Sequence, residues 1–137
     1  MKKIFSTKMI NTGGRSGEVH SPDNSFQLNI APPGSRAENA TNPEQLFAAG
    51  YSACFNSALD YLKKSRGITG ESTIEVIVSL YNISQSELPD VVLGVEIRGH
   101  IEGLSLEETK ELLEITEQTC PYSRATKGNI DVTIEAI

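Results

Sequence analysis

The sequence predicts an α+β fold, in which mostly antiparallel strands form a sheet and two substantial helices pack on it. Short alternations of apolar and polar residues, which are typical of strands, recur at both ends of the chain and in its centre. Two longer segments, at about 43–66 and 106–119, carry helix-start signals. The 137 residues have the length of one domain, so we expect a single domain over residues 1–137.

Three strands and a loop are expected before the first helix. We place the strands at residues 2–10, 18–20 and 26–30. The glycine-rich turn at residues 13–17 separates the first two strands, and the turn tetrapeptide at residues 22–25 separates the second from the third. Residues 31–41 carry two prolines and a glycine, so we expect a loop there.

The first helix has a well-marked start. Asn42 is a favoured N-cap, Pro43 suits the first helical position, and Gln45 completes an arrangement like a capping box. Gly67 is well placed to end the helix, which is then about 36 Å long. Apolar residues recur along one face at Phe47, Tyr51, Cys54, Ala58 and Leu62. Cys54 is therefore expected on the side that faces the core or a partner.

The rest of the chain continues with strands and a second helix. We place strands at residues 72–84, 91–101 and 130–134. In the middle one, the residues expected to point inward are Val91, Leu93, Val95, Ile97 and Ile101. Ser105 and Glu108 form a capping box that opens the second helix, and Pro121 stops it. Pro121 can itself open a further short helix through Ala125.

Charge and hydropathy exclude two classes of partner. Twelve Lys and Arg against 18 Asp and Glu give a net charge of −6, which argues against nucleic acid, because phosphate binding needs clustered cations. No stretch approaches the roughly 20 apolar residues of a membrane span, so we expect no membrane association. The first eight residues lack the apolar run of a secretory signal, and we expect a cytoplasmic location.

Cys54 and Cys120 are the only two cysteines, and they are 66 positions apart. A permanent disulfide is not expected in a reducing cytosol, so the pair is either catalytic or redox-active, or it consists of two buried thiols that act as small hydrophobes. We expect no metal, because the other soft ligands are His20 and His100 and no CxxC or HxxxH spacing occurs. Both histidines are read as ordinary strand residues.

A reactive cysteine must be a thiolate, and the sequence leaves open which cysteine this is. Cys54 lies some three turns inside its helix, where the dipole has faded and burial raises the thiol pKa. It therefore needs an inward-turned cation, for which Arg15 in the glycine-rich turn is the candidate. Cys120 precedes Pro121 at the start of a short helix with Arg124 nearby, so its local sequence makes it the more acidic candidate.

Two blocks of sequence resemble a known family. Residues 41–55, TNPEQLFAAGYSACF, and residues 120–129, CPYSRATKGN, resemble the two cysteine motifs of the organic hydroperoxide resistance (Ohr) family of the OsmC-like superfamily. The turn that bears Arg15 matches the position of the family's active-site arginine, and the likeness extends over essentially the whole chain. The second block favours the Ohr branch over OsmC proper. The fold implied is one of antiparallel sheets wrapped around a long central helix, in an intertwined homodimer.

The resemblance implies a thiol-dependent peroxidase for organic, fatty-acid-type hydroperoxides that protects against oxidative stress. In such enzymes the thiolate at the position of Cys54 attacks the peroxide and becomes a sulfenic acid. The cysteine at the position of Cys120 then forms a disulfide with it, before irreversible over-oxidation. No cofactor is implied, because an external dithiol, typically the lipoyl group of a lipoylated protein, restores the thiols.

The resemblance also assigns roles to other residues. Arg15 stabilises the Cys54 thiolate and polarises the peroxide, and Glu44 orients Arg15. An alkyl substrate tail suits the apolar neighbours Phe47, Tyr51 and Phe55, although packing in the core explains these three side chains equally well.

One difficulty concerns the spacing of Glu44 and Cys54. Ten residues of straight helix separate them by about 15 Å, so Arg15 cannot easily touch both in one chain. Either the helix breaks near Gly50, or the two residues of one site come from different subunits. The family forms homodimers with sites at the interface, so we predict the second arrangement.

Two other functions stay open at this point. One is a peroxidase of the OsmC branch with a broader range of peroxides. The other is a non-catalytic module that holds a hydrophobic ligand between subunits, with cysteines that are passive or act as a redox sensor.

Overall fold

A computed structural model describes residues 1–137, which form two compact units, residues 1–46 and 47–137. The two units are described separately, and the expected single domain stays a prediction. Helix α1 (Pro43–Ser65) is continuous, so the option of a break near Gly50 is wrong. None of the helices has the length and apolar character needed to cross a membrane.

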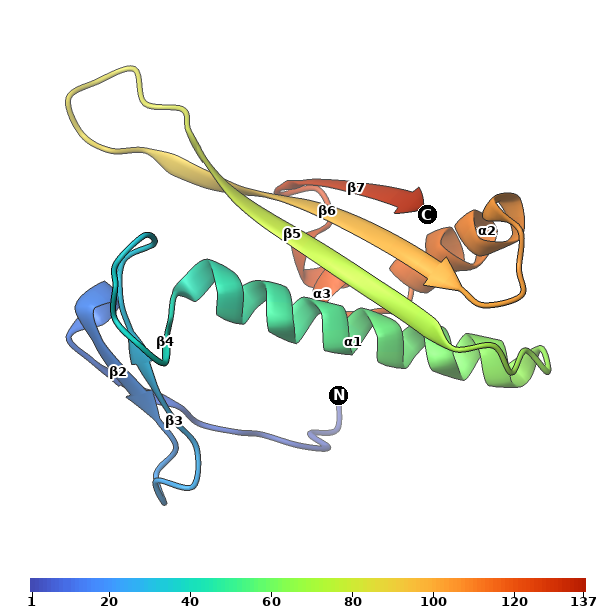
Figure 1. Ribbon diagram of the computed structural model, residues 1–137, viewed down its shortest axis with the longest axis horizontal. Helices are drawn as coiled ribbons and strands as arrows, with labels where there is room; N and C mark the ends of the chain where they lie inside the picture. The colour runs from blue at the N-terminus through green and yellow to red at the C-terminus, as the bar shows by residue number, and fades with distance from the viewer. The chain divides into compact units, whose positions relative to one another are not determined.

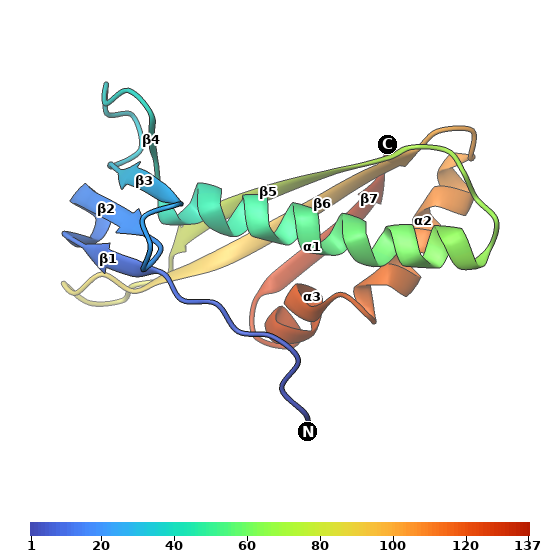
Figure 2. The same cartoon turned by 90° about the horizontal axis from the view of Figure 1, so that it is seen from below.

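The first unit is a four-stranded sheet of short strands in the order β1-β2-β3-β4 (Figures 1 and 2). Its elements are β1 (Ile10–Thr12), the 3-10 turn η1 (Gly14–Ser16), β2 (Gly17–His20), β3 (Gln27–Ile30) and β4 (Ala40–Thr41). Strands β1, β2 and β3 pair antiparallel, and β4 joins β3 in parallel.

The expected strand over residues 2–10 is wrong for most of its length, because the strand begins only at Ile10. Residues 1–9 have the composition of a strand but pair with no neighbouring strand in the chain. The expected loop over residues 31–41 is confirmed up to its last two residues, which form β4. Both differences concern pairing, which depends on what lies beside a segment as well as on its own sequence.

The second unit combines a three-stranded sheet with helices. The strands are β5 (Ser72–Asn82), β6 (Val91–Ile101) and β7 (Asp131–Ala136), and the further helices are α2 (Leu106–Glu117) and α3 (Pro121–Thr126). Strands β5 and β6 pair antiparallel over their full length, and β7 joins β6 in parallel. The fold class is therefore α+β as predicted, with parallel pairs at one edge of each sheet.

One face of this sheet is covered by the helices, with α1 running along the strands and α2 and α3 beside it (Figure 1). The core that results contains Tyr51, Phe55, Leu59, Val95, Ile97, Ile101, Leu112, Leu113 and Cys120. On the other face, Arg98 forms ion pairs with Glu75 at 3.6 Å and Glu135 at 3.3 Å. The expectation that Val91 points into the core is wrong, since Val91 is 52% exposed at the start of β6.

The helix ends follow the predicted capping closely. The side chain of Asn42 accepts from the backbone N–H of Gln45 at 2.8 Å, whereas the Gln45 side chain bonds to Thr41 instead of completing the box. Ser105 and Glu108 form a complete capping box at the start of α2. The short helix α3 begins at Pro121, as predicted from the proline.

Candidate functional site

Cys54 and Cys120 lie in contact within the second unit. Their Sγ atoms are 3.6 Å apart, with the thiol of Cys120 directed at the sulfur of Cys54. Cys54 is partly buried, whereas Cys120 is fully buried. Both are free thiols, and the separation is short enough for a disulfide to form with a small movement.

Each cysteine is held by its own secondary structure. Cys54 lies in the middle of α1, one residue before the buried Phe55 and therefore at the edge of the covered face. Cys120 is the N-cap of α3, and its backbone N–H donates to the carbonyl oxygen of Thr116 at 2.9 Å. The end of α2 and the start of α3 thus fix Cys120 from both sides.

Burial raises the pKa of the Cys54 thiol, and the nearby Cys120 raises it further. In the opposite direction, a hydrogen bond from the backbone N–H of Tyr122, in the first turn of α3, lowers it. Burial is the largest of these effects. Within this unit, Cys54 therefore lacks the cationic partner that a predominant thiolate at neutral pH requires.

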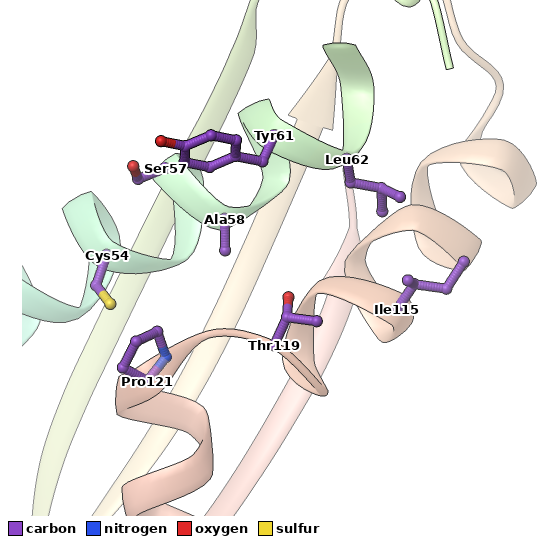
Figure 3. Close-up of a pocket in the computed structure, with 8 residues that line it drawn as sticks. All are labelled: Cys54, Ser57, Ala58, Tyr61, Leu62, Ile115, Thr119 and Pro121. Atoms are coloured by element: carbon purple, nitrogen blue, oxygen red, sulfur yellow. The ribbon is translucent and has the colours of Figure 1, made fainter. Parts of the chain in front are cut away.

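An apolar cleft of about 580 Å³ opens beside Cys54 (Figure 3). It lies between α1 and the segment that joins α2 to α3, and the side chain of Cys54 points toward Pro121 across it. The lining residues are Cys54, Ser57, Ala58, Tyr61, Leu62, Ile115, Thr119 and Pro121. A cleft of this size and polarity suits the hydrocarbon part of a small organic molecule.

Most of this lining was not singled out from the sequence. Ala58 and Leu62 belong to the apolar stripe of α1. Ser57 and Tyr61 each come one residue earlier in the chain and lie beside that stripe. Ile115 lies in the last turn of α2 and Thr119 in the segment that joins α2 to α3, and neither shows a distinctive pattern in sequence. These residues form a cleft only because α2 and α3 meet α1 at this point.

The three aromatic residues expected at the substrate lie elsewhere. Tyr51 and Phe55 are fully buried in the core, which is the alternative that the sequence left open. Phe47 is partly buried and packs edge-on against Tyr51 and at a tilt against Tyr122, with ring centroids 5.8 and 6.0 Å apart. A role for them in binding substrate stays a prediction.

Arg15 and Glu44 are joined within the first unit. The guanidinium donates two parallel hydrogen bonds to the carboxylate, 2.9 Å from Nη1 to Oε2 and 2.6 Å from Nη2 to Oε1, across 29 residues of sequence. The bonded guanidinium lowers the pKa of Glu44, and the carboxylate raises the pKa of Arg15. Such a bidentate pair fixes the plane of the guanidinium as well as its position.

The turn that carries Arg15 is tied together by Asn11. The Asn11 side chain donates to the carbonyl oxygens of Gly14 and Glu18 and accepts from the backbone N–H of Gly14. Gly13 adopts a φ of +84°, which favours glycine. Arg15 is thus presented from a closed turn, with its side chain half exposed and aimed by Glu44.

The predicted site residues therefore form two pairs, Cys54 with Cys120 in one unit and Arg15 with Glu44 in the other. Both histidines lie in strands, as expected. No group of three or more His, Cys, Asp or Glu side chains comes together as a set of metal ligands.

Comparisons with known proteins agree with these features. A family model described as OsmC-like protein matches residues 35–135. The chain is 44% identical to organic hydroperoxide resistance protein-like 2 of Staphylococcus epidermidis over 135 residues, which cover 96% of this chain and 94% of that protein. It is 41% identical to organic hydroperoxide resistance protein OhrA of Bacillus subtilis over 136 residues, 96% of this chain and 95% of that protein. The crystal structure of OhrB of Bacillus subtilis matches with a TM-score of 0.88 and 39% identity, covering 98% of this chain and 100% of that one.

Proposed function

Because the chain belongs to the OsmC-like protein family, and relatives along its whole length are named organic hydroperoxide resistance proteins, we propose that it protects against organic hydroperoxides by reducing them to alcohols. The enzyme is a thiol-dependent peroxidase, and hydroperoxides of the fatty-acid type are its substrates. The observation that carries this proposal is the 3.6 Å contact between two free thiols at the edge of an apolar cleft.

In the first step, the Cys54 thiolate attacks the distal oxygen of the hydroperoxide. An S–O bond forms as the O–O bond breaks, and the electron pair leaves with the alkoxide, which takes up a proton to become the alcohol. Cys54 is left as a sulfenic acid. The cleft supports this role, because its apolar side chains suit the alkyl part of the substrate beside the reacting sulfur.

In the second step, the Cys120 thiol attacks the sulfenic sulfur of Cys54. The S–S bond forms as the S–O bond breaks, and the hydroxide leaves with the thiol proton as water. The two sulfur atoms need to approach from 3.6 Å to about 2.05 Å, the length of a disulfide bond. Their contact in the reduced chain supports a fast second step.

An external dithiol, of the kind found in lipoylated proteins, completes the cycle. Its thiolate attacks the sulfur of Cys54, which is the less buried member of the pair, and releases Cys120 as a thiol. The second thiol of the donor then closes on the mixed disulfide, so the donor leaves as a cyclic disulfide and both cysteines are thiols again. A cytoplasmic location fits this cycle, because a reducing compartment keeps dithiol donors available.

Arg15 and Glu44 supply the missing cation, and we assign them to the partner subunit of a homodimer. Burial raises the pKa of Cys54 in its own unit, so the thiolate needs a guanidinium beside it. The unbroken α1 removes the option of a bend near Gly50 that would bring Glu44 toward Cys54 of the same chain.

Exposed apolar residues support a second copy as the partner. In the first unit these include Ile4, Phe5 and Phe26, and on the β5–β6 hairpin they include Leu80, Tyr81, Ile83, Leu88 and Val91. Large exposed apolar groups of this kind mark surfaces that a partner covers.

Stopped-flow consumption of cumene hydroperoxide tests the proposal. We expect Cys54→Ser to abolish turnover, and Cys120→Ser to allow one turnover and then stall, because the sulfenic acid has no thiol to condense with. Full activity in Cys54→Ser would contradict the proposal and favour a passive binding module. Equal rates with hydrogen peroxide and cumene hydroperoxide would instead favour a peroxidase of broader range.

A further inference from the structure

The hydroxyl of Tyr51 bonds to two residues of α3, although its ring lies in the core. Its Oη atom lies 2.9 Å from Ser123 Oγ and 3.2 Å from Thr126 Oγ1, and all three residues are buried. Tyr51 precedes Cys54 by three residues on α1, and Cys120 is the N-cap of α3. We propose that Tyr51 is a positioning residue that fixes α3 against α1 and so keeps Cys120 in contact with Cys54.

The donors and acceptors of this cluster can be assigned in one consistent direction. Thr126 Oγ1 donates to the carbonyl oxygen of Ser123 at 3.1 Å, so its oxygen is left to accept from Tyr51. The single proton of Tyr51 is then used, and the Tyr51 oxygen accepts from the hydroxyl of Ser123. The resulting chain of hydrogen bonds runs from Ser123 through Tyr51 to Thr126 and back to the backbone of α3. Buried bonds in such a chain strengthen one another.

Helix α3 depends on these contacts for its position. It has six residues, and a helix this short is not stable without tertiary support. Two other polar contacts join α1 to α3, the one between the sulfurs and the hydrogen bond from the Tyr122 N–H to Cys54, and the two bonds of Tyr51 add to them. The ring of Tyr122, on α3, packs against the ring of Tyr51 with centroids 5.5 Å apart. Tyr51 therefore joins the two elements that carry the cysteines, through its ring and its hydroxyl.

The inference rests on the proposed function and concerns its second step. When Cys54 is a sulfenic acid, attack by Cys120 forms the disulfide and releases water. In competition, a second hydroperoxide adds an oxygen to Cys54, which gives a sulfinic acid and an alcohol and ends the cycle. A fixed α3 favours the first reaction, because it raises the effective concentration of the Cys120 thiol at the Cys54 sulfur.

Tyr51→Phe tests this role, since it keeps the ring and removes only the hydroxyl. Equilibration in glutathione redox buffers measures the effective concentration of the two thiols without any hydroperoxide. We expect this concentration to fall several-fold, up to about the tenfold that corresponds to a loss of about 1.4 kcal/mol of hydrogen bonding. After treatment with excess cumene hydroperoxide, mass spectrometry is expected to find more Cys54 sulfinic acid than in the wild type.

Two control variants separate positioning from general stability. Thr133→Val likewise removes one side-chain hydroxyl, at an exposed position of β7, and we expect it to match the wild type. Ile101→Val removes a methylene group from the buried end of β6 and lowers the unfolding free energy by about 1 kcal/mol. A merely structural role would make Tyr51→Phe behave like Ile101→Val, with a lower unfolding midpoint and an unchanged glutathione equilibrium. That result would overturn the inference.

Thr126→Val provides a second variant that leaves the tyrosine in place. It removes one end of the hydroxyl chain, and we expect it to reproduce the effect of Tyr51→Phe in the same direction. An unchanged glutathione equilibrium in both variants would likewise overturn the inference. If wild-type Cys54 fails to react with hydroperoxide, the proposed function is wrong, and the glutathione measurement still decides whether Tyr51 positions the cysteines.

Discussion

Gly17 lies so close to the backbone of Thr12 that a Cβ atom at this position would overlap the Thr12 carbonyl oxygen. The two residues face each other where β1 and β2 leave the turn that carries Arg15, and Thr12 pairs with the next residue, Glu18. A side chain at position 17 therefore fits only if the two strands separate. The presentation of Arg15 thus depends on a glycine that makes no contact with substrate or sulfur in the proposed mechanism.

Gly17→Ala is expected to destabilise the first unit and to impair the peroxidase. The overlap costs about 1–3 kcal/mol, and its relief moves the turn that aims Arg15. Urea unfolding and kcat/KM for cumene hydroperoxide measure the two effects. Gly34→Ala is the control, because its φ of +79° is strained for alanine while no atom lies within 4 Å of the added Cβ. Wild-type kcat/KM in Gly17→Ala would contradict the link between this turn and catalysis.

Arg15→Ala is expected to raise the pKa of Cys54, because burial and the nearby Cys120 both raise it and the guanidinium is the proposed counter-charge. The midpoint of pH-dependent alkylation at Cys54 then moves to higher pH, and less thiolate is present at pH 7. We expect kcat/KM to fall on the order of 100-fold. Arg36→Ala, in the loop between β3 and β4, removes a like charge and serves as the control. An alkylation profile that does not move in Arg15→Ala would remove Arg15 from the mechanism.

The local parts of this fold could be predicted because their signals are local. Asn42 and Ser105 act as helix caps with partners three residues away, and Pro121 starts α3 through its own fixed backbone angle. Strand β6, which contains Ile97, follows from its alternation of apolar and polar residues. The functional pairing of Cys54 with Cys120 was predicted from a family resemblance, since no local pattern relates positions 54 and 120.

Other parts depend on what packs beside them and were not predictable from pattern. Val91 has the alternation of a core residue but lies at the start of β6, where it is exposed. Tyr51 belongs to an apolar stripe, and nothing in that stripe reveals that its hydroxyl bonds to α3. A signal was present in the partner segment, because Ser123 and Thr126 are three residues apart and so share one face of a helix.

Oxidation of the cysteine pair is expected to stabilise the chain. A disulfide between Cys54 and Cys120 closes a loop of 66 residues, which corresponds to about 4 kcal/mol of unfolding free energy in the chain-entropy model. Urea unfolding of the reduced protein and of protein treated with one equivalent of cumene hydroperoxide measures the difference in unfolding free energy. Remaining oxidant is removed before unfolding. Cys120→Ser treated in the same way should show no gain. A treated wild type that unfolds at the same urea concentration as the reduced protein would contradict the formation of this bond.

The cleft beside Cys54 is expected to select organic hydroperoxides. Ala58→Leu adds three carbon atoms to its floor, and we expect kcat/KM for cumene hydroperoxide to fall about tenfold, since crowding of this kind costs 1–3 kcal/mol. Hydrogen peroxide has no alkyl part, so its rate should change little. Ala37→Leu, in an exposed loop of the first unit, is the matched control. An equal loss with both peroxides would mean that Ala58→Leu disturbs the sulfur rather than the binding of the alkyl group.

Mixed dimers are expected to reveal which chain supplies Arg15. If Arg15 acts on Cys54 of the partner subunit, a heterodimer of Arg15→Ala and Cys54→Ser chains contains one complete site, because the first chain brings the cysteine and the second brings the arginine. Each variant alone has no complete site. Denaturing and refolding the two variants together should therefore restore hydroperoxide consumption well above the mean of the separate proteins.

The alternative arrangement gives the opposite result in the same experiment. If each Cys54 used the Arg15 of its own chain, both sites of the heterodimer would lack one residue, and mixing would restore nothing. The doubly substituted chain, Arg15→Ala with Cys54→Ser, mixed with wild type is the control for subunit exchange, since it leaves no complete site in a heterodimer of the trans arrangement and one in the cis arrangement. Activity that falls on this mixing would support the trans arrangement a second time, because each exchanged wild-type chain loses its partner's arginine.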